Sequence, residues 1–185
     1  MKSEMSLHRR AWLGRGMLSG GGVGAANSAV RKPSHRDLPF ENMLREGVAV
    51  ATEIVRDATG TDLSDFKPAN LRVIDRLFGP PFSDRVKQDT KTYNTSIVAF
   101  GSYLGEVMVR NLGGQWHFPN FFQLIVASIS WSHFTTSRYL YVVLGKKNAH
   151  VFRAAKMAID NTSKAFSLYE FYELYARDDE LSQIR

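Results

Sequence analysis

Tyr103-Leu-Gly-Glu-Val-Met-Val-Arg-Asn-Leu-Gly-Gly-Gln-Trp116 carries the clearest structural signal in this 185-residue chain. Apolar or small residues recur in and before it at helical spacing and predict one buried helix face: Ile97, Gly101, Leu104, Met108 and Leu112. Gly113 and Gly114 predict the end of that helix, because glycine adopts the left-handed conformation of a helix C-terminus without a Cβ penalty. The stretch therefore predicts a helix followed by a sharp stop and an aromatic residue.

Two glycines lie inside the same helix, one turn apart. Gly101 and Gly105 each cost about 1 kcal/mol relative to alanine in a helix, so another interaction must offset them. We expect close approach of another element, most simply a sheet. The alternative is that the glycines form the floor of a ligand site, with Tyr103, Glu106 and Arg110 as its walls.

Charged and aromatic side chains make this stretch the candidate functional site. Glu106 precedes Arg110 by four residues, the favourable order for an ion pair worth about 0.3–0.5 kcal/mol when exposed. Together with Tyr103 and Trp116, these two residues form the candidate set for binding a ligand or a partner.

The same stretch resembles a family of small bacterial proteins of unknown function. These proteins carry a Y-[LI]-G-E-V-x-x-R-x-x-G-G-x-W helix and turn, which corresponds here to Tyr103–Trp116. The upstream segment Asp65-Phe-Lys-Pro-Ala-Asn-Leu-Arg-Val-Ile-Asp75 and the downstream segment Tyr141–Arg153 extend the resemblance to residues 40–176. The resemblance implies kinship but no reaction, because the family has no assigned activity.

Composition and charge exclude several classes of function. The absence of cysteine excludes disulfides, thiolate nucleophiles and cysteine-ligated metal centres. Half of the formal charge of +6 falls in residues 1–29, where four basic residues face one acidic residue. The remaining sequence has no dense Lys/Arg stripe interleaved with aromatics and no zinc-finger motif, so we do not expect nucleic-acid binding.

The N-terminal segment resembles a bacterial twin-arginine export signal. Arg9 and Arg10 are followed by Trp12 and Leu13, by a Gly/Ala-rich run, and by small residues at Ala26-Asn-Ser-Ala29. We therefore expect residues 1–38 to be a signal-like or disordered tail and linker, with export by that route. The alternative is a cytoplasmic protein with a Gly-rich basic tail.

Residues 39–185 are expected to form a single α+β domain. Helices are predicted from Phe40 to Gly60, from Pro68 to Phe78, and from an N-cap at Ser83 to Gly113, with a weak point at Thr90–Ser96. Two to four antiparallel strands should follow, including Phe121–Ser128 and Arg138–Leu144. We then expect a helix capped by Asn148 and a final helix over Phe166–Tyr175, so that helices surround a small sheet.

The sequence offers no recognisable catalytic or metal site. It has no His-Glu-x-x-His pairing, no Gly-x-Ser-x-Gly elbow, no phosphate-binding glycine loop and no apolar run of about 18 residues for a membrane span. A carboxylate pair of Glu106 with Glu170 or Glu173 stays open. We expect a non-catalytic, protein-binding or accessory module without cofactor, for example one with an immunity-like role. The alternative is an enzyme or small-ligand binder with a pocket beside Glu106, Arg110 and Trp116.

Overall fold

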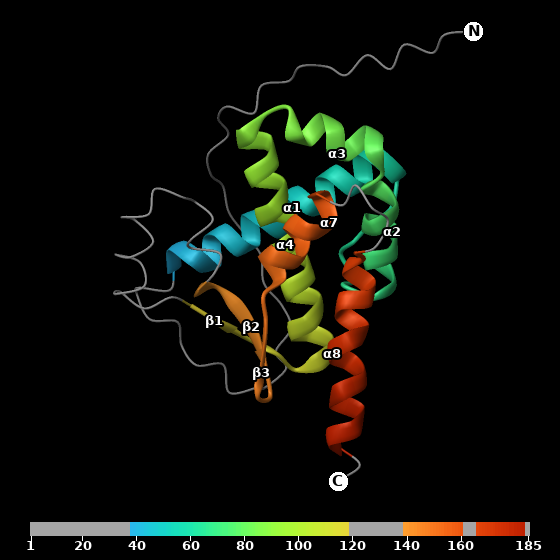
Figure 1. Cartoon of the computed structure of the whole chain (residues 1–185). Coiled ribbons are helices and arrows are strands. Elements are labelled where there is room, and N and C mark those ends of the chain that lie inside the picture. The colour runs from blue at the N-terminus through green and yellow to red at the C-terminus, as the bar shows by residue number, and fades with distance from the viewer. Residues whose placement is uncertain (1–37, 119–138, 161–165, 184–185) are drawn as a thin grey trace, which may run out of the picture. The chain divides into compact units, whose positions relative to one another are not determined.

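Helix α4, Thr90–Leu112, is the centre of the fold, and most of its residues from Ser96 onward are buried. It packs against α1, α3, α7 and α8 and against the sheet, as Figure 1 shows. The helix ends at Gly113, whose φ of 68° is left-handed. The predicted glycine stop is therefore confirmed.

A small antiparallel sheet accompanies the helices, so the predicted α+β class is confirmed. The computed structural model describes residues 38–118, 139–160 and 166–183, which all lie within the unit that spans residues 33–185. Within these ranges there are six α-helices and three strands. The predicted strand over Phe121–Ser128 and the predicted export signal lie outside the described residues.

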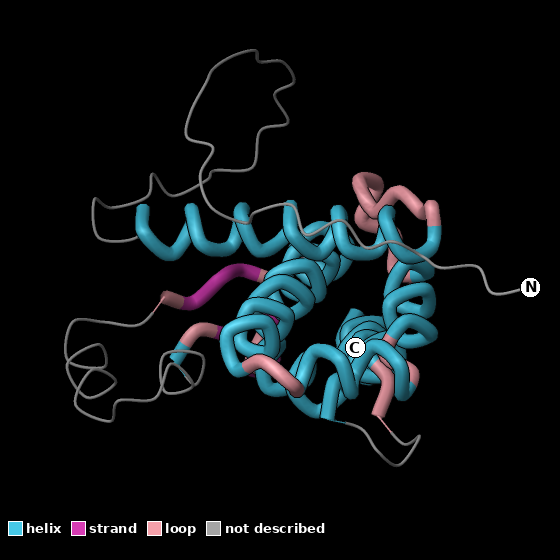
Figure 2. The backbone as a smooth tube through the Cα atoms, turned by 90° about the horizontal axis from the view of Figure 1, so that it is seen from above, coloured by secondary structure: helices cyan, strands magenta, loops and turns pink. Residues whose placement is uncertain are grey.

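The first two helices agree with the sequence prediction. Helix α1, Leu38–Thr59, packs along α4, and Figure 2 shows it passing across the neighbouring helices. Gly60 follows it with a φ of 73°, a conformation that favours glycine. Helix α2, Ala69–Leu77, begins directly after Pro68, whose fixed φ suits a helix start.

The predicted start of the third helix is wrong. Helix α3, Pro80–Lys87, begins three residues before Ser83, because prolines are well suited to the first helical turn, where their missing N–H is not needed. The predicted weak point is also misplaced. The chain breaks before Thr90, where the Asp89 carboxylate accepts a hydrogen bond from the Thr92 amide at 2.8 Å and so caps α4.

The sheet has the order β1-β2-β3, with both pairs antiparallel. Strand β1, Gln115–His117, pairs with β2, Tyr141–Leu144, and β2 pairs with β3, Lys147–Ala149. Asn148 lies in β3 opposite Val143, so the predicted helix cap at this residue is wrong. The cause is the tight turn at Gly145, whose φ of 57° returns the chain for a third strand.

Two C-terminal helices complete the described structure. Helix α7, Val151–Asp160, packs its apolar face against α4, and α8, Leu168–Gln183, packs against α2, α4 and α7. Within the described ranges, every helix is too short or too polar to pass through a lipid bilayer.

Candidate functional site

The space above Gly105 is occupied by the indole of Trp116. A Cβ atom at residue 105 would lie 2.1 Å from Cη2 and 2.2 Å from Cζ2 of this indole, far inside normal contact. The glycine therefore lets strand β1 approach α4, as expected for packing against a sheet. The ligand-floor interpretation has no support at Gly105, because the chain's own tryptophan fills that position.

Gly101 is explained by a different neighbour. A Cβ atom there would lie 2.5 Å from Cδ1 and 3.0 Å from Cα of Phe152. Phe152 belongs to α7, so the close approach at Gly101 is made by a helix and not by the predicted sheet. The two glycines thus allow one helix and one strand to pack closely on the same side of α4. The ring centroids of Phe152 and Trp116 lie 6.1 Å apart.

Glu106 joins two of the other candidate residues. Its Oε2 lies 3.3 Å from Nε of Arg110, and its Oε1 accepts a hydrogen bond from Nε1 of Trp116 at 3.0 Å. The Glu106 side chain is 24% exposed and that of Arg110 is 54% exposed. Both carboxylate oxygens therefore have partners inside the chain, and the ion pair lies at the rim of the cluster.

Arg110 continues the cluster toward the loop before α2. Its guanidinium lies 3.7 Å from the centroid of the Phe66 ring, which in turn stacks on the Tyr103 ring at 5.4 Å. Phe66 has a φ of 53°, an unfavourable conformation for a residue with a bulky side chain. Asn111 helps to hold it there, because its Nδ2 donates to the Phe66 carbonyl at 2.9 Å.

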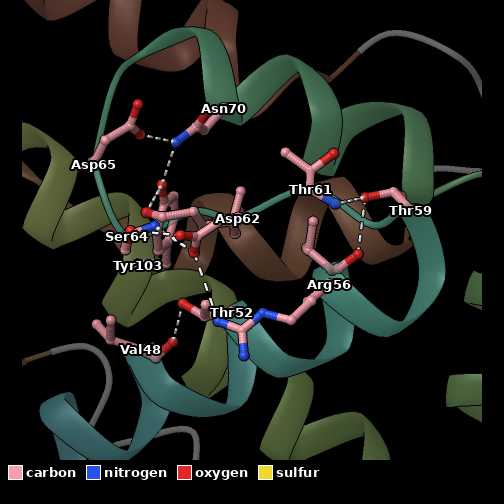
Figure 3. A network of polar contacts seen from close by, with 12 residues as sticks. Val48, Thr52, Arg56, Thr59, Thr61, Asp62, Ser64, Asp65, Asn70 and Tyr103 are labelled. Atoms are coloured by element: carbon pink, nitrogen blue, oxygen red, sulfur yellow. Dashed lines mark hydrogen bonds and ion pairs between the residues drawn. The ribbon is translucent and has the colours of Figure 1, made fainter.

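Tyr103 is fully buried and connects α4 to the same loop. Its hydroxyl donates to the Leu63 carbonyl at 3.0 Å and accepts from Nδ2 of Asn70 at 3.1 Å. Asn70 also donates to Oδ1 of Asp65 at 2.6 Å, as Figure 3 shows. Burial raises the pKa of Tyr103 from 10.0 to about 12, so its hydroxyl stays protonated and serves as a structural donor.

The loop also holds an exposed acidic turn. Asp62 accepts from the amide of Ser64 at 3.1 Å and from its hydroxyl at 2.8 Å, and it lies 3.6 Å from Arg56 (Figure 3). The hydrogen bonds from Ser64 lower the pKa of Asp62, with a smaller contribution from Arg56. These contacts fix the backbone that precedes Phe66.

Sequence reasoning missed the role of Asp75. Its carboxylate accepts from the Ser167 hydroxyl at 2.6 Å and from the amides of Leu168 and Tyr169 at 2.7 Å and 3.1 Å. A side chain of α2 thus caps the N-terminus of α8, where a negative charge is favourable. The capping-box pattern Ser167-x-x-Glu170, in which the Ser167 hydroxyl also accepts from the Glu170 amide at 3.1 Å, indicates where α8 begins but does not point to Asp75.

Other polar groups form structural contacts as well. Tyr93 donates to Asp160 at 2.5 Å, and Lys156 also pairs with Asp160, which joins the start of α4 to the end of α7. Burial works against the charge of Asp160, but the hydrogen bonds from Lys156 and Tyr93 prevail and lower its pKa. No group of three or more His, Asp or Glu side chains among the described residues has the arrangement of a metal site.

The structure brings Tyr103, Glu106, Arg110 and Trp116 into one continuous cluster in which Phe66 is the link. The cluster joins the loop before α2 to α4 and strand β1, and the Glu106 carboxylate, the Trp116 indole N–H and the Tyr103 hydroxyl all have partners within the chain. The four candidate site residues therefore have a structural role. No protein-family model, curated protein sequence or solved structure matches the chain.

Proposed function

We propose that the chain is a non-catalytic module that binds another protein. The observation that carries this proposal is the pairing of Glu106, whose two carboxylate oxygens go to Arg110 and Trp116. A general acid, general base or ligand-orienting carboxylate needs an oxygen directed at the substrate. In this cluster the carboxylate instead supports the contact between α4 and β1.

The environment of Tyr103 supports the same conclusion. Its hydroxyl is buried, has both a donor and an acceptor partner within the chain, and has a pKa far above neutral pH. A buried, protonated tyrosine with these partners stabilises a fold better than it transfers protons. The motif that gives the sequence its family resemblance thus supports an architectural role, and we place binding on the outer helix surfaces.

An accessory or immunity-like role fits such a module. Proteins of this kind act by occupying a partner's surface and need no catalytic group of their own. The resemblance to small bacterial proteins without assigned reactions is compatible with this role.

The test is to capture partners with the full-length chain from a lysate of its native host and to measure the purified partner by isothermal titration calorimetry. A saturable complex of fixed stoichiometry is the expected result. Glu106→Gln should leave that affinity within twofold of the wild-type value. If the chain captures only small molecules, or if Glu106→Gln abolishes binding without changing stability, the pocket beside Arg110 and Trp116 is the better explanation.

A further inference from the structure

We draw no further inference here: the strongest candidate, the row of His117, Tyr141 and His150 rings across the three-stranded sheet, carries no proposal because nothing among the described residues shows what covers it.

Discussion

Replacing Gly105 by alanine probes the contact on which the folding of the motif depends. The new Cβ would lie 2.1 Å from Cη2 of Trp116, whereas carbon atoms in contact prefer about 3.5–4.0 Å, so the indole must shift by more than about 1 Å. That shift stretches the 3.0 Å hydrogen bond from the indole to Glu106. Alanine gains about 1 kcal/mol in helix propensity, but overpacking costs about 1–3 kcal/mol and loss of the bond about 1–2 kcal/mol. We expect a net destabilisation of about 1–4 kcal/mol.

Urea unfolding of four proteins measures this effect and its cause. They are the wild type, Gly105→Ala, Trp116→Val and the double variant. Valine at position 116 keeps a strand-forming residue and removes the indole ring, so Gly105→Ala should then become stabilising by about 1 kcal/mol. A Gly105→Ala effect of the same sign and size in both backgrounds would refute the proposed contact with the indole.

Three further predictions concern other parts of the chain. Because the pKa of Tyr103 is raised to about 12, the unfolded chain loses its phenolic proton first, and the free energy of unfolding should fall by about 2 kcal/mol between pH 10 and pH 12. Tyr103→Phe should remove that part of the fall in urea titrations at the two pH values. Asp75→Ala should destabilise the protein by about 2–3 kcal/mol through loss of the α8 cap, and a change below about 0.5 kcal/mol in thermal unfolding would exclude this role. Residues 1–32 fused to a reporter should direct export in a host with twin-arginine machinery, and Arg9→Lys with Arg10→Lys should abolish it; a cytoplasmic wild-type fusion would disprove the signal.

Local chemistry explains where sequence reasoning succeeded. Gly60 and Gly113 end helices because each takes a positive φ, a preference that belongs to the residue itself. The errors near Pro80 and Asp89 are also local. Both residues are strong helix-start signals: Pro80 starts α3 before Ser83 is reached, and Asp89 caps the separate helix α4.

The sequence pattern could not predict contacts between residues that are distant in the chain. Gly101 predicted a close neighbour, but the identity of Phe152 on a later helix depends on how α7 packs. Asp75 caps a helix more than ninety residues away, and no local pattern links the two. Tyr103, by contrast, was selected as a candidate site residue, yet the loop that uses its hydroxyl emerges only from the fold.

Strand β1 was missed for a physical reason as well. It has three residues, too few for an alternating pattern, and only its pairing with β2 defines it. Trp116 acquires its position over Gly105 through this pairing. The sequence therefore indicated that the motif residues matter together, while the register of the sheet decides which atoms meet.

We propose that the motif cluster maintains the fold and that binding occurs elsewhere. Glu106→Gln separates these two roles, because glutamine keeps an acceptor for Trp116 and loses only the ion pair with the exposed Arg110. The decisive measurement is the affinity of this variant for the partner protein captured from the host lysate, with its unfolding free energy determined in parallel. We predict an affinity within twofold of the wild type and a stability loss below about 1 kcal/mol. A loss of affinity of tenfold or more at unchanged stability would contradict the claim and identify the cluster as the binding site.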